Sequence, residues 1–102
     1  MPTLSPPIPR ERLATLCRKH HIRRLSLFGS VLRDDFGPES DIDIVVEFET
    51  GHVPGFLRLH AIEEELSALL GGRTVDLVTP KSLSPRLRDR VLAEAQLQYE
   101  GG

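Results

Sequence analysis

The stretch "LFGSVLRDDFGPESDIDIVVEFE", from Leu27 to Glu49, decides how this chain is interpreted. An apolar run ends at the pair Gly29-Ser30, and ten residues separate this pair from a second apolar run that carries Asp41 and Asp43. Aspartate is depleted in β-strands, so two aspartates in a run rich in Ile and Val require a reason. The stretch therefore predicts a strand whose carboxylates serve a chemical purpose.

The two aspartates of this strand are predicted to bind a divalent cation. Residues two apart on a strand project from the same face, about 6.6 Å apart along the chain. Both carboxylates are ionised at neutral pH and repel each other unless a cation lies between them. Such hard oxygen ligands suit Mg²⁺, which fills its shell with water and substrate phosphate oxygens. Asp76, in the strand-like run "RTVDLVT", supplies a third carboxylate. Three carboxylates can hold two metal ions about 3.5–4 Å apart, as in nucleotidyl transfer.

The pair Gly29-Ser30 is predicted to bind phosphate. It stands where a strand feeds a predicted short helix over residues 31–34. Glycine lets a phosphate approach the backbone, and the free N–H groups at a helix start bind anions. Taken alone, a Gly-Ser pair is a turn and a helix cap, and an Asp-x-Asp strand can be a solvent-facing edge. The combination is more specific than either part.

The remaining pattern predicts an α/β (α+β) fold. Residues 1–8 read as a flexible N-terminal tail, and residues 9–102 as a single domain. Pro9 suits the first position of a helix. The other predicted elements are strands over 22–29, 41–48 and 73–79, a helix over 56–70, a helix capped by Ser84 and a short strand near the C-terminus.

Composition narrows the class of protein. The chain has 102 residues and a net charge of −2, which is not the basic excess expected of a nucleic-acid-binding protein. Its single cysteine, Cys17, excludes an internal disulfide and fits a reducing compartment. No apolar run approaches the roughly 20 residues of a membrane span. We therefore expect a cytoplasmic protein that binds neither membrane nor nucleic acid directly.

The segment "GSVLRDDFGPESDID" resembles the signature of the DNA polymerase β-like nucleotidyltransferase superfamily. From Pro9 to Glu100 the chain is similar to its minimal stand-alone members, the MNT-domain antitoxins that accompany HEPN-domain toxins. The resemblance implies a small mixed β-sheet flanked by helices, and an enzyme.

The resemblance also assigns roles to residues. It implies that Gly29 and Ser30 hold the nucleoside triphosphate, with Arg33 and Ser40 in the same nucleotide-binding set. Asp41 and Asp43 would bind Mg²⁺. The third carboxylate, Asp76, would bind metal or act as the base that deprotonates the acceptor hydroxyl.

The reaction implied by the resemblance is transfer of AMP from ATP to a tyrosine hydroxyl of a HEPN ribonuclease toxin, which silences the toxin. The short chain leaves no room for an acceptor-holding domain, so we expect a hetero-oligomer with that toxin. Two alternatives stay open from the sequence. One is an antitoxin that neutralises its toxin by binding alone, and the other is a nucleotidyltransferase that acts on a small molecule or on tRNA.

Overall fold

A computed structural model describes residues 9–29 and 41–101 of the chain. This part of the chain contains both helices and strands. In chain order they are α1 (Arg10–Lys19), β1 (Ile22–Phe28), β2 (Ile42–Phe48), α2 (Phe56–Leu69), β3 (Val75–Val78), the 3-10 helix η2 (Pro80–Ser82), α3 (Pro85–Glu94) and β4 (Gln96–Glu100).

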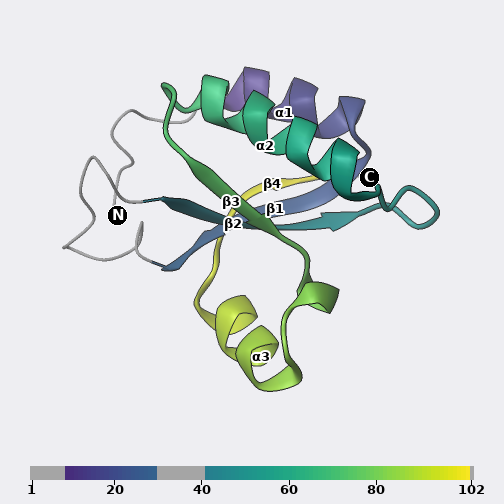
Figure 1. Ribbon diagram of the computed structural model, residues 1–102, viewed down its shortest axis with the longest axis vertical. Coiled ribbons are helices and arrows are strands. Elements are labelled where there is room, and N and C mark those ends of the chain that lie inside the picture. Colours follow the sequence, from purple (N-terminus) through teal and green to yellow (C-terminus); the bar gives the residue numbers. More distant parts are fainter. Residues whose placement is uncertain (1–8, 30–40, 102) are drawn as a thin grey trace.

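The strands form one mixed sheet with the order β3-β2-β1-β4 (Figure 1). The strand β1 pairs antiparallel with both β2 and β4, whereas β2 and β3 are parallel. A parallel pair needs a long crossover, and here α2 provides it. This mixed sheet with flanking helices confirms the predicted fold class.

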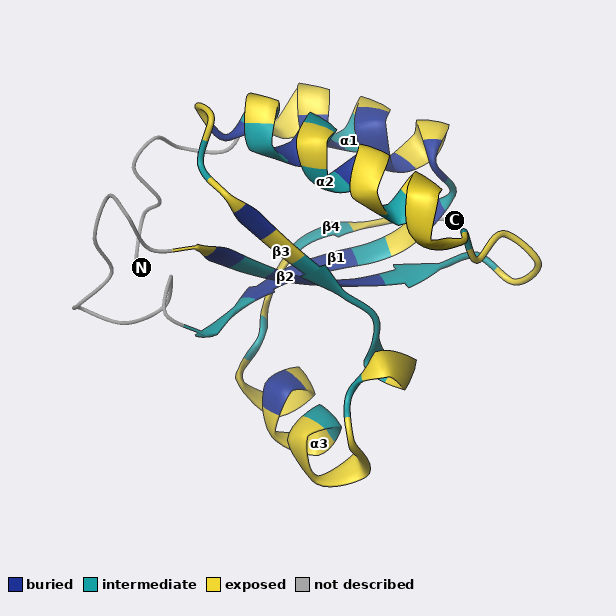
Figure 2. Ribbon diagram, viewed as in Figure 1, coloured by how far each residue is buried: buried dark blue, intermediate teal, exposed yellow. Residues whose placement is uncertain are grey.

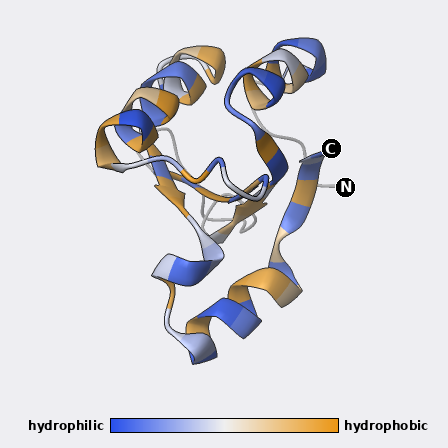
Figure 3. Ribbon diagram, turned by 90° about the vertical axis from the view of Figure 1, so that its right-hand side faces the viewer, coloured by the Kyte–Doolittle hydropathy of each residue, from blue (hydrophilic) through white to orange (hydrophobic). Residues whose placement is uncertain are grey.

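Helices α1 and α2 cover one face of the sheet, and α3 lies on the other side (Figures 1 and 3). The main core lies between the sheet and the first two helices, whose buried residues are on the side toward the strands and whose outer sides are exposed (Figure 2). Its buried members are Leu13, Leu16, Cys17, Ile22, Leu25, Leu27, Ile42, Ile44, Val46, Ile62, Leu66, Leu70 and Val75.

The α3 side of the sheet is less apolar. Val45 on β2 and Val91 on α3 are buried, but neither belongs to the main core. On α3 itself, Leu87 is 47% exposed although Val91 is buried. Ser84 caps α3 as predicted, since its Oγ accepts a hydrogen bond from the Leu87 N–H. Polar side chains can therefore be accommodated on the α3 side of the sheet.

Element boundaries differ from the predictions in small ways. Helix α1 begins at Arg10 because Pro9 takes the extended conformation of an N-cap. The strand β3 is shorter than the predicted 73–79, since Pro80 begins η2 directly after Thr79. The short C-terminal strand is present as β4. The short helix predicted over residues 31–34 lies outside the described residues.

Within the described residues, none of the helices is both long enough and apolar enough to cross a membrane.

Candidate active site

The central feature of the candidate site is the register between β2 and β3. Asp43 pairs with Asp76, and the preceding residues Ile42 and Val75 pair with each other. Register partners on neighbouring strands stand about 4.8 Å apart and project from the same face. Ile42 and Val75 belong to the core under α1 and α2, so both aspartates project toward the α3 side. The sheet thus brings together two carboxylates that are 33 positions apart in the sequence.

The two carboxylates differ in exposure. Asp43 is half-buried in the middle of the sheet, whereas Asp76 is exposed on the edge strand β3. Asp41 directly precedes β2 and is also exposed. A molecule approaching from solvent would therefore meet Asp41 and Asp76 before it meets Asp43.

Gly29 lies against the carboxylate of Asp43. It follows Phe28, the register partner of Asp43 on β1. Its φ of +77° is in the left-handed region that side chains disfavour. A Cβ added at Gly29 would overlap the Asp43 Oδ2 atom and would lie 3.2 Å from Cγ. A glycine at this position therefore lets the end of β1 pass close beside the Asp43 carboxylate.

Three predicted nucleotide-binding residues lie outside the described residues: Ser30, Arg33 and Ser40. The structure places Gly29, which directly precedes Ser30, and Asp41, which directly follows Ser40.

The residues present fit a hard divalent cation in chemistry and placement. The donors are carboxylate oxygens from neighbouring strands on one sheet face, which is the donor set that Mg²⁺ favours. Along the described ranges, however, no three His, Cys, Asp or Glu side chains are gathered closely enough to hold a metal ion by themselves. This is compatible with Mg²⁺, which takes one or two protein carboxylates and completes its shell with water and substrate phosphates.

Tyr99, the single tyrosine of the chain, lies away from these aspartates. It is on β4, packs against the main core and pairs in register with Leu25, whose side chain belongs to that core. Its hydroxyl lies next to Gly101. Tyr99 is therefore on the helix-covered face of the sheet, opposite to Asp43 and Asp76.

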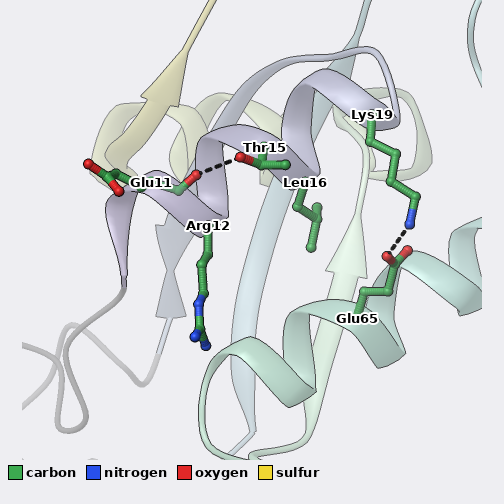
Figure 4. A pocket seen from close by; sticks show the side chains of 6 residues that line it. All are labelled: Glu11, Arg12, Thr15, Leu16, Lys19 and Glu65. Carbon is green, nitrogen blue, oxygen red and sulfur yellow. Dashed lines mark hydrogen bonds and ion pairs between the residues drawn. The ribbon is translucent and has the colours of Figure 1, made fainter.

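A pocket on the helical side contains none of the predicted site residues (Figure 4). Its walls come from α1 and α2, and an ion pair of 2.7 Å between Lys19 and Glu65 bridges the two helices. Its lining residues are Glu11, Arg12, Thr15, Leu16, Lys19 and Glu65. This pocket belongs to the packing of the helices and not to the carboxylate face.

Comparison with known proteins identifies the family. The sequence matches the family described as "Nucleotidyltransferase domain" over residues 10–98. The chain belongs to the nucleotidyltransferase domain family. This match confirms the predicted resemblance and the prediction of a nucleotidyltransferase enzyme.

Individual relatives of this nucleotidyltransferase are consistent with that assignment. The protein adenylyltransferase MntA of Thermococcus cleftensis is 42% identical over 73 residues, which cover 72% of this chain and 71% of the relative. A solved structure provisionally described as a minimal nucleotidyltransferase is 41% identical, with a TM-score of 0.70 over 85% of this chain and 86% of that one.

A more distant structural neighbour comes from Shewanella oneidensis. It is a chain of a complex between a tri-AMPylated HEPN toxin and its MNT antitoxin. The matched region covers 90% of this nucleotidyltransferase and 70% of the neighbour. The TM-score is 0.64 at 23% identity, so this likeness shows the fold alone.

Proposed function

We propose that this nucleotidyltransferase is an antitoxin that transfers AMP from ATP to a tyrosine hydroxyl of a partner HEPN-domain toxin. The observation that carries the proposal is the pairing of Asp43 with Asp76 on one sheet face of a nucleotidyltransferase domain. The name of the Thermococcus relative, a protein adenylyltransferase, supports AMP as the transferred group and protein as the acceptor. The neighbour with a tri-AMPylated HEPN toxin supports the class of partner.

The geometry suggests a division of roles between the carboxylates. Asp43 is half-buried and fixed by strands on both sides, which suits a residue that holds the site together. Asp76 is exposed on an edge strand, where an acceptor carried by another protein can reach it. We assign the binding of Mg²⁺ to Asp41 and Asp43, and assign Asp76 as a further metal ligand or as the base.

The proposed reaction is a single in-line displacement. The tyrosine oxygen attacks the α-phosphorus of ATP, a new P–O bond forms, and the bond between the α- and β-phosphates breaks to release pyrophosphate. The hydroxyl proton passes to the carboxylate of Asp76 when that residue acts as the base. One or two Mg²⁺ ions, each bound by one or two of these aspartates together with phosphate oxygens, would neutralise the phosphate charge. Gly29 would let a phosphate approach the backbone at the site. Ser30, Arg33 and Ser40 are assigned to bind the phosphates of ATP.

Acceptor geometry also favours transfer to another molecule. The single tyrosine of the chain, Tyr99, lies on the opposite sheet face and cannot meet a nucleotide bound at Asp43. The acceptor is therefore assigned to a partner that docks against the carboxylate face and forms a hetero-oligomer with this chain. We assign this reaction to the cytoplasm, where ATP is available and a single cysteine such as Cys17 stays reduced.

The test uses a candidate HEPN-domain partner, sought in the reading frame next to the gene for this chain. The two proteins are incubated with ATP labelled at the α-phosphate and with Mg²⁺, and parallel reactions contain EDTA, tRNA or a panel of small hydroxyl compounds. The proposal expects label on the partner, and only with Mg²⁺. Label on tRNA or on a small compound, with none on the partner, would replace it with one of the alternatives.

A further inference from the structure

We infer that Glu63 of α2 is a positioning residue for Asp76, and this inference rests on the proposed function. Glu63 does not reach the carboxylate face. Its Oε2 atom accepts a hydrogen bond from the backbone N–H of Leu77 at 3.0 Å. That N–H belongs to the peptide bond that joins Asp76 to Leu77, so Glu63 holds the backbone directly beside the proposed catalytic carboxylate.

The need for such a contact follows from the position of β3. This strand has four residues and stands at the edge of the sheet, with β2 as its neighbour on one side. The carbonyl of Thr74 accepts a hydrogen bond from the Ile42 N–H at 2.8 Å, so the backbone of Thr74 faces β2. Because successive residues of a strand alternate, Asp76 also turns its backbone groups to β2, whereas Leu77 turns its N–H to the open edge.

Helix α2 supplies hydrogen bonds to this open edge at two points. Glu63 accepts the hydrogen bond from the Leu77 N–H. One helical turn later, the hydroxyl of Ser67 donates a hydrogen bond to the carbonyl of Arg73 at 2.6 Å. The two contacts lie on either side of Asp76 along the chain. They replace the neighbouring strand that β3 lacks on this side.

Glu63 is itself held in place. Its side chain is 27% exposed, and its Oε1 atom is 3.5 Å from the Nδ1 atom of His60 on the preceding turn. Hydrogen bonds to an ionised carboxylate are shorter and stronger than neutral ones. Glu63 can therefore fix the Asp76–Leu77 peptide more firmly than water could at the same edge.

For function, these contacts keep β3 in register with β2, so that Asp76 stays beside Asp43. An edge strand of four residues with one partner strand is free to fray, and fraying would move Asp76 away from Asp43. The contacts from Glu63 and Ser67 couple Asp76 to α2, which packs on the core through Ile62 and Leu66. The position of the exposed carboxylate is thereby tied to the buried core.

Two neighbouring glutamates and Ser67 provide the variants for a test. Glu63→Ala removes the acceptor for the Leu77 N–H, and Glu63→Gln keeps an acceptor oxygen but removes the charge. Glu64→Ala is the matched control, because Glu64 is 72% exposed and its ion pair is with His60 on its own helix. Ser67→Ala tests the second contact independently and serves if Glu63→Ala does not fold.

The measurements are amide hydrogen exchange at Leu77 and the steady-state rate of AMP transfer. For Glu63→Ala we expect exchange at Leu77 to accelerate about tenfold or more, and kcat to fall about 10–100-fold, the usual cost of losing a supporting contact behind an active residue. The KM for ATP should stay within about threefold of wild type, since ground-state binding is untouched. Glu63→Gln should keep most of the activity, and Glu64→Ala all of it.

Two results would overturn the inference. One is a Glu63→Ala variant with unchanged exchange at Leu77 and unchanged kcat, and the other is a Glu63→Gln variant as impaired as Glu63→Ala. Failure of the proposed function gives a different result, because the wild-type protein would then transfer no AMP. In that case exchange at Leu77 alone decides whether Glu63 holds β3.

Discussion

Asp43 and Asp76 are register partners on two parallel strands, and both project from the sheet face that α1 and α2 leave uncovered. Two neighbouring carboxylates are stabilised by a cation that binds between them. The register of β2 and β3 therefore creates the proposed metal site.

Metal binding should be confined to this face. Titration with Mn²⁺, a paramagnetic substitute for Mg²⁺, should broaden the backbone NMR signals of Gly29, Asp43 and Asp76 and leave that of Tyr99 sharp. Asp43→Asn should weaken the effect by about tenfold or more, since one oxygen ligand loses its charge. Asp89→Asn, a change in an exposed aspartate of α3, is the control. Equal broadening in wild type and Asp43→Asn would contradict a site at Asp43.

Gly29→Ala should lower the rate of AMP transfer by more than backbone strain alone would cause. Alanine in a left-handed conformation costs about 1–2 kcal/mol, and at this position its Cβ would also displace the Asp43 carboxylate. Such a displacement should lower AMP transfer about 10–100-fold.

The matched control for this change is Gly51→Ala. Gly51 has a similar φ of +83°, but nothing lies within 4 Å of the position that a Cβ would take. Both variants should lose similar stability in thermal unfolding, and only Gly29→Ala should lose activity. Equal activity in the two variants would show that the contact with Asp43 is unimportant.

Tyr99 should not be an acceptor. Its hydroxyl lies next to Gly101 on the helix-covered face, so it stays distant from a nucleotide bound at the aspartates. Tandem mass spectrometry after incubation with ATP and Mg²⁺ should find Tyr99 unmodified. Tyr99→Phe should transfer AMP to the partner at the wild-type rate. An AMP-modified Tyr99 would require a different arrangement of β4.

The ion pair between α1 and α2 should make stability depend on pH in the acid range. The hydrogen bond from Lys19, and then that from His20, hold the pKa of Glu65 below its ordinary value of 4.5. A depressed carboxylate pKa stabilises the fold above about pH 4.5, and this contribution is lost as the pH falls through the lower folded-state pKa. Thermal unfolding should therefore separate wild type from Glu65→Gln at neutral pH, and the difference should shrink on acidification. A difference that grew in acid would contradict this sign.

Cys17 should be inert in the folded protein. Burial raises the pKa of its thiol to about 12, so almost no thiolate exists at neutral pH. Iodoacetamide should leave the native protein unmodified and alkylate it after denaturation in urea. Rapid alkylation of the native protein would show that α1 does not stay packed on the sheet.

The sequence predicted the order of elements and the two faces of β2 because these depend on short-range patterns. The alternation of Ile42 and Ile44 with Asp43 has the period of a strand, and the structure buries the first two and not the third. Ser84 and the following proline define the start of α3 in the same local way. These features need no knowledge of what packs against them.

The pairing of strands could not be predicted in this way. Whether Asp76 faces Asp43 depends on the register between β2 and β3, and a slip along the strands would separate them without changing either sequence. Glu63 was missed for a similar reason, since on its helix it looks like one of three solvent-facing glutamates. Its position beside the buried Ile62 was the available signal. The predicted roles of Ser30, Arg33 and Ser40 stay predictions.

The central claim is that the face bearing Asp43 and Asp76 transfers AMP to a protein partner. The most direct measurement is tandem mass spectrometry of the HEPN-domain partner after incubation with ATP, Mg²⁺ and either the wild-type chain or its Asp43→Asn variant. The account predicts AMP on a partner tyrosine with the wild type, and a loss of about 100-fold or more with the variant. A partner that stays unmodified yet is neutralised equally by both proteins would contradict it and leave an antitoxin that acts by binding alone.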